Sequence, residues 1–287
     1  DTDGNDGLDL SHDGNGIPDY IEKVGFFADS AYYMLTIQMG YEIEPADDDG
    51  IYDIYINYLP PGHYGFNWAE GDGVSYLEIG SNYEGYNSSA TPDQLLQISL
   101  SHEYFHAIQR GYKPNYSSND RYFLEMSSMW FEDVIVPNGN DYLDDWVVPL
   151  LNNPTADFDN TGRDGYELAL FGHYLSKFID RKGQIDEKQS TIMREIWERY
   201  RDYSTSAFSA VKYILMDPTK IYNTSFIVTW VDFMTRNLYN GIYEDMDNDF
   251  YYYSDQALIE PILTITPTIN DSISIDLDLD NKSASLI

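Results

Sequence analysis

A long capped helix in this sequence contains an H-E-x-x-H motif. The run Thr91-Pro92-Asp93-Gln94 has the pattern of a capping box with proline at the first helical position. We expect the helix to run from Pro92 to about Arg110, because Gly111 is a typical C-terminal stop. The motif, His102-Glu103-Tyr104-Phe105-His106, then lies inside the helix. Histidines four residues apart project from the same face, so both imidazoles can reach one zinc ion.

The motif predicts a catalytic zinc site. Zinc polarises a carbonyl oxygen and lowers the pKa of water bound to it, and Glu103 is placed to take a proton from that water as general base. A catalytic zinc ion has three protein ligands and one open position. Position 112, where the extended form of the motif has a third histidine, is Tyr112. The extended type of site is therefore excluded.

A carboxylate on the next helix is the expected third ligand. Glu125 is the first candidate, with 18 residues between it and His106. Glu132 lies seven residues after Glu125 on the same predicted helical face. It either binds the metal itself, hydrogen-bonds to a ligand histidine, or is a solvated helix residue.

These residues resemble the gluzincin metallopeptidases, the thermolysin and M1-aminopeptidase type of zincin. In that pattern a glutamate on a second helix follows H-E-x-x-H at the same spacing, and the segment 122–130 is similar to its "W-L-x-E-G-x-A-x-W" stretch. Met126 and Ser127 depart from the usual small residues after the glutamate. The resemblance implies a zincin-like fold, peptide hydrolysis, and a zinc ion held by His102, His106 and Glu125.

A narrower resemblance covers most of residues 11–180. The segments 13–20, 64–66, 102–106 and 124–125 occur in the order found in a family of secreted microbial metallopeptidases with an N-terminal calcium-type loop. This resemblance implies an exported enzyme that needs both zinc and calcium.

A hydrolase of this kind also needs a hydrogen-bond donor for the oxyanion that develops during the reaction. Tyr166 and His173 are candidates, because they are seven residues apart on a helix expected over 166–181 and would share a face. The alternative for His173 is a core histidine with a satisfied hydrogen bond. The strand expected over 74–79 precedes the zinc helix, at the place where zincins have a strand that pairs with the substrate. The alternative is that this strand has only a structural role.

The acidic N-terminus has the spacing of a twelve-residue calcium loop. With Ser11 as the first position, Gly16 falls at the turn, and oxygen ligands are expected from Ser11, Asp13, Asn15, Ile17 (through its carbonyl), Asp19 and Glu22. The run resembles the Asp-rich calcium repeats of extracellular thrombospondin type 3 and dockerin modules. The alternative is a solvated acidic tail.

Charge and composition exclude several classes of partner. There are 49 acidic residues against 16 basic ones, a formal net charge of −33, which argues against nucleic acid because phosphate binding needs basic residues. No apolar run reaches the roughly 18 residues that span a bilayer. The chain has no cysteine, so a transition-metal site must use histidines and carboxylates. Calcium at millimolar levels is found outside cells, which favours a secreted or cell-surface protein.

Strand segments followed by helical segments predict an α+β fold. We expect a first helix over 18–40, strands over 51–58 and 74–79, and later helices near 121–133, 166–181, 187–202 and 225–239. The predicted organisation is a calcium-loop segment (1–22), a zincin-like metallopeptidase domain (23–265), and a linker with the first strand of a truncated C-terminal β domain (266–287). That strand is expected over 272–280, where apolar residues alternate strictly.

The sequence as a whole therefore predicts a secreted zinc-dependent metallopeptidase acting on peptide or protein substrates. An endopeptidase is preferred, because no G-x-M-E-N exopeptidase signature precedes the motif. The alternative is a non-catalytic, calcium-dependent adhesion module with a structural zinc site. The intact Glu103 favours the enzyme, because a structural site has no use for that carboxylate.

Overall fold

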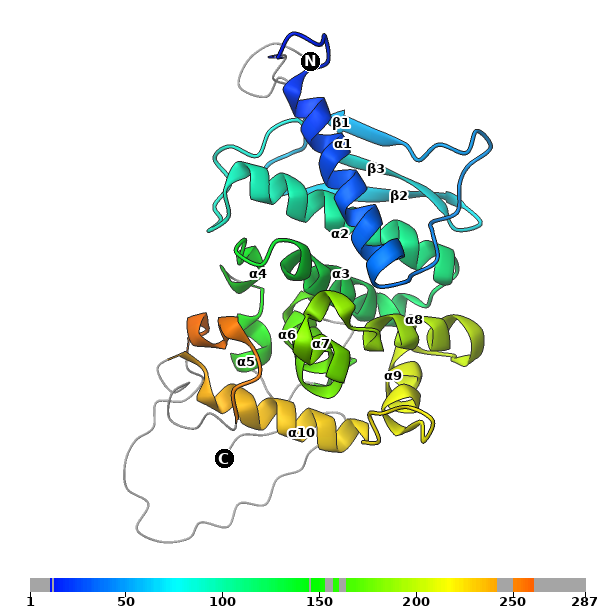
Figure 1. Cartoon of the computed structure of the whole chain (residues 1–287), viewed down its shortest axis with the longest axis vertical. Coiled ribbons are helices and arrows are strands. Elements are labelled where there is room, and N and C mark those ends of the chain that lie inside the picture. The colour runs from blue at the N-terminus through cyan, green and yellow to red at the C-terminus, as the bar shows by residue number, and fades with distance from the viewer. Residues whose placement is uncertain are drawn as a thin grey trace, which may run out of the picture.

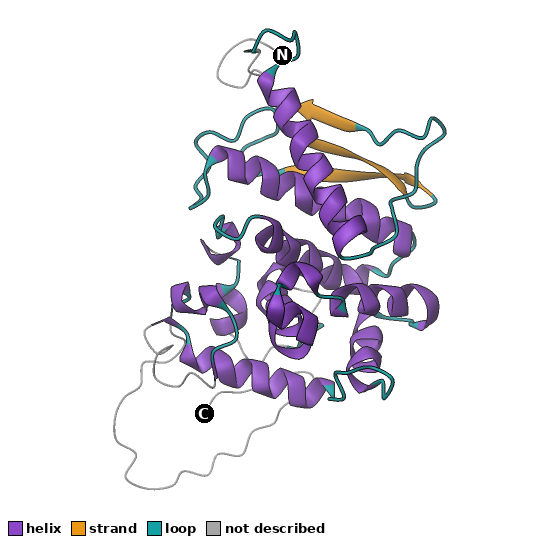
Figure 2. Ribbon diagram, in the orientation of Figure 1, coloured by secondary structure: helices purple, strands orange, loops and turns teal. Residues whose placement is uncertain are grey.

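A computed structural model describes residues 11, 13–144, 146–152, 157–159, 164–241 and 250–260 of the 287-residue chain. The described part is α+β, as predicted, with one small sheet and many helices (Figure 1). The strands are confined to one end of the molecule (Figure 2). The strand expected over 272–280, and positions 1–10 and 12 of the predicted calcium segment, lie outside the described residues.

The three-stranded sheet has the order β1-β3-β2. Strand β1 (Ile54–Asn57) is parallel to β3 (Val74–Gly80), and β2 (Gly65–Gly71) is antiparallel to β3. Because β3 is paired on both sides, it has no free edge, and the hypothesis that this strand pairs with a substrate is wrong. Strand β2 is an edge strand of the sheet, so one of its edges is free of pairing within the sheet.

The helix that carries the H-E-x-x-H motif, α2 (Pro92–Tyr112), begins as predicted. The Thr91 hydroxyl accepts a hydrogen bond from the Gln94 amide, and the Gln94 side chain accepts one from the Thr91 amide. The helix continues past Gly111, which was expected to end it. A Cβ atom at this glycine would lie 2.8 Å from Cδ of Pro45, so Gly111 allows the chain before β1 to pack closely on α2.

The remaining elements are helical. The first helix, α1 (Asp19–Tyr32), continues into a π-helical segment (Tyr33–Gln38). After α2 come α3 (Arg121–Ile135), α4 (Asp141–Asp144), α5 (Val148–Asn152), α6 (Ala169–Tyr174), α7 (Arg181–Ile185), α8 (Ile192–Tyr203), α9 (Ala207–Met216) and α10 (Phe226–Arg236), with short 3₁₀ turns at Ser118–Asp120, Tyr166–Leu168, Glu187–Gln189, Asn237–Tyr239 and Ser254–Leu258.

The helix expected over 166–181 is broken into several pieces. A 3₁₀ turn (Tyr166–Leu168) precedes α6, a π-helical segment (Leu175–Ile179) follows it, and α7 begins only after Asp180. Asp180 has an extended backbone, and its buried carboxylate caps α7 through the Lys182 amide. Because the segment is not one straight helix, Tyr166 and His173 do not share a face as expected.

Helix α2 lies between the sheet and the helical part of the molecule (Figure 1). It packs on β2, β3 and α1 on one side and on α3 on the other. Leu77 and Ile79 of β3 are fully buried on the α2 side of the sheet. None of the helices in the described segments is long and apolar enough to cross a membrane.

Candidate metal centre

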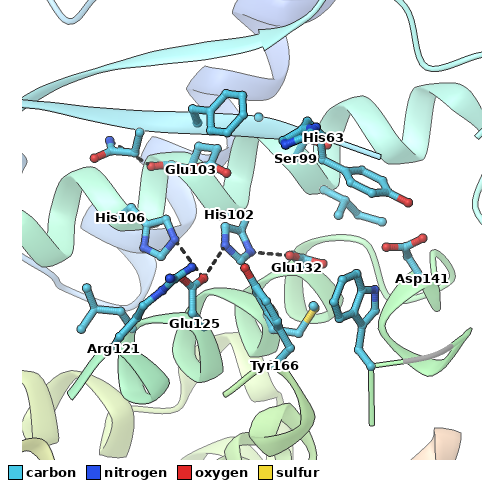
Figure 3. Close-up of a pocket in the computed structure, with 18 of the residues that line it drawn as sticks. His63, Ser99, His102, Glu103, His106, Arg121, Glu125, Glu132, Asp141 and Tyr166 are labelled. Atoms are coloured by element: carbon cyan, nitrogen blue, oxygen red, sulfur yellow. Dashed lines mark hydrogen bonds and ion pairs between the residues drawn. The ribbon is translucent and has the colours of Figure 1, made fainter. Parts of the chain in front are cut away.

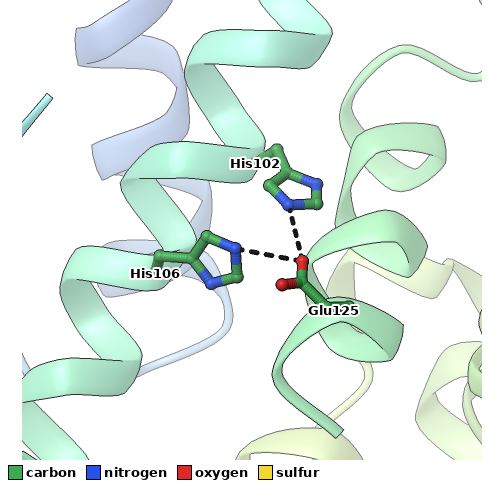
Figure 4. Close-up of side chains that lie close together, drawn as sticks. All are labelled: His102, His106 and Glu125. Carbon is green, nitrogen blue, oxygen red and sulfur yellow. Dashed lines mark hydrogen bonds and ion pairs between the residues drawn. The ribbon is translucent and has the colours of Figure 1, made fainter. Parts of the chain in front are cut away.

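Two histidines of α2 and one glutamate of α3 come together where these two helices face each other (Figure 4). Nε2 of His102 and Nε2 of His106 lie 3.2 Å and 3.3 Å from the same oxygen of Glu125, Oε2. One ligand atom from each of the three residues lies within 4.8 Å of the other two. Two imidazole nitrogens and one carboxylate are the protein ligands of many catalytic zinc sites.

The other ring nitrogen of each histidine is held by an acceptor. Nδ1 of His102 lies 2.5 Å from Oε1 of Glu132, and Nδ1 of His106 lies 2.8 Å from Oε1 of Gln109. The Gln109 side-chain nitrogen donates to the Leu124 carbonyl 3.1 Å away, which turns the amide oxygen toward His106. Protons on both Nδ1 atoms leave both Nε2 atoms free for a metal.

The geometry therefore gives Glu132 a different place from Glu125. Of the two roles in a metal site considered for Glu132, its position corresponds to hydrogen bonding to a ligand histidine. Such carboxylates fix the ring orientation and raise the basicity of the ligand.

The centre holds more negative than positive charge. Burial alone would raise the pKa of Glu125, but the imidazoles of His106 and His102 hold it well below its usual value. Burial raises the pKa of Glu132 to about 7, against the opposing effect of His102. On the outer side, the Arg121 guanidinium binds Oε1 of Glu125 at 3.2 Å. Three glutamates, counting Glu103, lie with two histidines and two arginines, Arg121 and Arg110, so negative charge exceeds positive charge while the imidazoles are neutral, a balance that suits a divalent cation.

Glu103 lies against β2 rather than in open solvent. A Cβ atom on Gly65 of β2 would be only 2.9 Å from Cγ of Glu103, so only glycine allows this approach. The Asn67 side chain donates to the backbone carbonyl of Glu103 at 3.4 Å, and Arg110 in turn binds Asn67. Burial raises the pKa of Glu103 above its usual value, which makes the carboxylate a stronger base once it is ionised.

An open cavity of about 450 Å³ leads to these residues (Figure 3). Its walls come from α2, α3, the loop before β2, the first half of β2, and the segment before α6. Besides the residues above, the lining includes His63, Phe66, Tyr116, Met129 and Trp146. Ligand cavities have this size and a similar mixture of apolar walls and a few polar groups.

Tyr166, one of the two residues predicted as an oxyanion donor, lines this cavity. Its ring centroid is 6.0 Å from that of His102, and its side chain rises toward His102 and Glu125 (Figure 3). Gly165, with φ of 95°, sets its position, because a Cβ atom there would lie 2.2 Å from the Tyr122 carbonyl oxygen. Burial, together with the charges of Glu125 and Glu103, raises the pKa of Tyr166, so its hydroxyl stays protonated and can donate.

His173 lies elsewhere, and its prediction as an oxyanion donor is not supported. It is fully buried on α6, where Nδ1 is 2.7 Å from Glu187 and the ring stacks on Tyr253 at a centroid distance of 4.3 Å. It does not line the cavity. The break in the predicted helix is the physical reason, and the core-histidine alternative describes its surroundings.

The predicted calcium residues lie together at the start of α1. Oxygens of Asp13, Asp19 and Glu22 come within 4.8 Å of one another, and Asn15 donates to Oε1 of Glu22 at 2.7 Å. The Asp13 carboxylate accepts the Asn15 amide. The two remaining positions take part through the backbone: the Ser11 carbonyl accepts the Asp19 amide, and the Ile17 amide binds the Asn15 side chain.

Sequence reasoning missed several residues that build the centre. Gln109 is three residues after His106, a spacing that places the two on one helical side, and Arg121 is four residues before Glu125. Those two spacings were available as signals. Gly65 and Gly165 had none, because each is required by a close approach of segments far apart in the sequence.

No protein-family model matches the chain, and searches of curated proteins and of solved structures also find no match.

Proposed function

We propose that this protein is a zinc-dependent metallopeptidase with a zincin-like arrangement of its catalytic residues. The observation that carries the proposal is the convergence of the His102 and His106 Nε2 atoms on one oxygen of Glu125, beside Glu103 and at the end of an open cavity. The donor set suits zinc, since calcium and magnesium favour all-oxygen sites.

Each residue of the centre has a defined part in peptide hydrolysis. A bound zinc ion supplies Lewis acidity toward a carbonyl oxygen and makes water more acidic. Glu103 accepts the proton of the attacking water and passes it to the leaving amine. Tyr166 donates a hydrogen bond to the oxyanion that forms at the scissile carbonyl. Glu132 and Gln109 hold the two histidines in the orientation that leaves Nε2 free.

The free edge of β2 supports a peptide as the substrate. An extended peptide can add to a free strand edge through main-chain hydrogen bonds. Gly65, Phe66 and Asn67 of β2 line the cavity, and Gly65 contacts Glu103. A peptide paired there has its carbonyl groups beside the proposed base. Because a strand edge can bind an extended segment from the interior of a polypeptide, this arrangement favours an endopeptidase.

The alternative, an adhesion module with a structural zinc site, is less well supported. Structural zinc sites are closed by four protein ligands, whereas His102, His106 and Glu125 form a three-ligand group beside an open cavity. A purely structural site also gives no reason for the close approach of Glu103 and Gly65.

The proposal includes a calcium site at the start of α1, formed by Asp13, Asp19, Glu22 and Asn15 with Ser11 and Ile17 in the positions of a calcium loop. Such sites are filled at extracellular calcium levels, which supports a secreted or cell-surface protein.

The test combines metal content with hydrolysis. The purified chain is expected to hold one zinc ion and to cleave casein or a quenched fluorogenic peptide. Activity should be lost with a zinc chelator and should return with added zinc. A chain that binds one zinc ion but cleaves no peptide across a mixed peptide library contradicts the proposal and favours the adhesion module.

A further inference from the structure

The outward side of the sheet carries a continuous aromatic surface. Trp68 is paired with Tyr76, and both Tyr55 and Phe66 are aligned with Glu78, so all of these side chains project from the same side. The ring centroids of Tyr55 and Tyr76 are 5.2 Å apart, and those of Phe66 and Trp68 are 5.4 Å apart. Tyr55 and Trp68 are 50% and 44% exposed, which is unusual for such large side chains on one small sheet. We call Tyr55, Phe66, Trp68 and Tyr76 the aromatic face.

Uncompensated negative charge lies within this face. The Glu78 carboxylate accepts hydrogen bonds from Nε1 of Trp68 and Nδ2 of Asn57, both at 2.8 Å, and both donors are neutral. Asp53 accepts the Tyr55 hydroxyl, and the charges of Asp53 and Glu70 raise the pKa of Tyr55. No ion pair in the described part of the chain involves Asp53, Glu70 or Glu78.

Aromatic rings with nearby carboxylates are complementary to cations. Guanidinium and ammonium groups stack over tryptophan and tyrosine rings, and they bind carboxylates through charge-assisted hydrogen bonds. A neutral ligand would leave three negative charges uncompensated. Anionic surfaces, and a second copy of the same acidic face, are repelled.

The aromatic face is continuous with the cavity of the candidate metal centre. Phe66 lines that cavity and contacts Trp68, and His63, also in the lining, lies 5.3 Å from Phe66 between ring centroids. A polypeptide that leaves the cavity over β2 therefore meets Phe66 first and Trp68 next.

We propose that the aromatic face is an exosite that binds Arg- or Lys-rich segments of polypeptide substrates. The inference rests on the proposed peptidase function only in calling the bound polypeptide a substrate. The binding itself does not require catalysis. Trp68 and Tyr76 stack on the cationic groups, and Glu78 accepts their hydrogen bonds. The expected partners are polypeptides with a basic segment beside the cleaved region.

The binding test uses the full chain with Glu103→Gln, so that a peptide is held and not cleaved. The probe is a twelve-residue Gly/Arg peptide, with a Gly/Ser peptide, a Gly/Glu peptide and cellohexaose as comparisons, measured by calorimetry at low and high salt. We expect the Gly/Arg peptide alone to bind, with an affinity that falls with salt. Adding Trp68→Ala or Glu78→Gln should each raise Kd about tenfold.

Two variants serve as matched controls. Tyr203→Ala removes an aromatic side chain that is 74% exposed on α8, and Asp29→Asn removes an exposed carboxylate on α1; neither should change Kd. Equal Kd values with and without Trp68 overturn the inference, as does cellohexaose or Gly/Ser binding that depends on Trp68, or no binding at low salt.

A kinetic test separates this inference from the proposed function. In the active chain, Trp68→Ala should raise KM for a fluorogenic peptide with an Arg-rich tail and leave KM for the same peptide with a Gly/Ser tail unchanged. An unchanged KM for both overturns the exosite while hydrolysis stands. If no peptide is hydrolysed but the Gly/Arg peptide still binds in a Trp68-dependent way, the peptidase proposal fails and the binding site stands.

Discussion

At the scale of single residues, the proposed centre depends on which oxygen or nitrogen each side chain presents. His102 uses Nδ1 for Glu132 and His106 uses Nδ1 for Gln109, so the two Nε2 atoms face Glu125 together. Glu103 makes no part of that group and lies against Gly65. The residues proposed to hold a metal are therefore distinct from the residue proposed to move a proton, and each can be tested separately.

The first prediction concerns Glu103 as general base. Glu103→Gln keeps the size of the side chain but removes the proton acceptor, so hydrolysis should fall by 10²–10⁴-fold or more. Zinc stoichiometry and the melting temperature should not change, because Glu103 does not belong to the three-ligand group. The measurements are peptide cleavage, metal analysis and thermal unfolding. Full activity in this variant would eliminate the mechanism.

The second prediction separates Glu125 from Glu132. Glu125→Ala removes one of the three proposed ligands and should abolish stable zinc binding. Glu132→Ala removes only the partner of His102 Nδ1 and should weaken zinc affinity by about 10–100-fold. Competition with a calibrated zinc chelator measures both affinities. The reverse order of the two effects would make Glu132 the ligand.

At the scale of elements, the proposed active site depends on the contact between α2 and β2. Gly65→Ala should lower the rate of hydrolysis by at least tenfold, because its Cβ atom would lie 2.9 Å from Cγ of Glu103 and 3.3 Å from the Glu78 carbonyl oxygen. Zinc affinity should be unchanged, since no ligand residue is touched.

A glycine on α1 offers the matched control. Nothing lies within 4 Å of a Cβ atom at Gly25, so Gly25→Ala should leave the rate unchanged and stabilise the helix by about 0.5–1 kcal/mol. The measurements are the initial rates of hydrolysis and the unfolding curves of the Gly65→Ala and Gly25→Ala variants. Wild-type kinetics in Gly65→Ala would show that β2 and Glu103 are not coupled.

Elements with strong local signals were predictable. The capping box and the helical pattern predicted α2 and α3 within a few residues, alternation predicted β1, and a short run closed by Gly80 predicted β3. Strand β2 has glycine at both ends and is defined by its pairing with β3, which is not a local property. Helix α9 and the break after α6 also involve contacts between segments far apart in the sequence. The Asp120 carboxylate accepts the Ala207 amide at the start of α9, and the Asp180 carboxylate accepts the amides of Thr191 and Ile192 at the start of α8.

The residues of the candidate site also divide into those with a local sequence signal and those placed by tertiary contacts. His102, Glu103 and His106 follow from helical spacing, and Glu125 from spacing and resemblance. Tyr166 lines the cavity although the helix on which it was expected does not exist as one piece. His173 was expected there from that same helix and lies in a different buried cluster. A face shared on a predicted helix is informative only when the helix is continuous.

At the scale of the whole molecule, His173 connects separate parts of the helical half. Burial would lower its pKa, but Glu187 and Asp133 raise it above 6.5. Burial would raise the pKa of Glu187, and His173 holds it at about 2 instead of 4.5. Tyr253 stacks on His173 and donates a hydrogen bond to Asp133. The cluster therefore ties α3 and α6 to the segment before the last described 3₁₀ turn.

The sign of the pH dependence follows from these two shifts. The raised pKa of His173 means that its contribution to stability is complete below pH 6.5 and is lost as the pH rises through the raised value. The lowered pKa of Glu187 means that its contribution is present above pH 4.5 and is lost as the pH falls toward about 2. Stability from this pair should be greatest between pH 4.5 and 6.5.

The fourth prediction compares the wild type with His173→Gln across pH 4–9. The wild type should be more stable by about 3 kcal/mol near pH 6, because a buried charged partner is left alone in the variant. That difference in unfolding free energy should shrink as the pH rises. Urea unfolding at each pH gives the values. A difference that stays constant to pH 9 would mean that the histidine contributes only packing.

The last prediction concerns calcium and the net charge of −33. Asp13, Asp19 and Glu22 hold carboxylates within 4.8 Å of one another on an exposed segment, and like charges at that distance repel unless a cation lies between them. A ligand that binds only the folded state adds about 2.7 kcal/mol at one hundred times its Kd, which for a chain of this size raises the melting temperature by about 5 °C. Magnesium should substitute poorly, because it requires tight octahedral geometry.

Asp13→Asn combined with Asp19→Asn should remove the calcium response and leave zinc content unchanged. The matched control is Asp47→Asn with Asp49→Asn, in an exposed turn whose carboxylates accept backbone amides. That control should lose a little stability equally with and without calcium. Scanning calorimetry in calcium and in a calcium-selective chelator measures all three chains. Identical wild-type melting in both conditions would reduce the segment before α1 to an acidic lead-in without a bound ion.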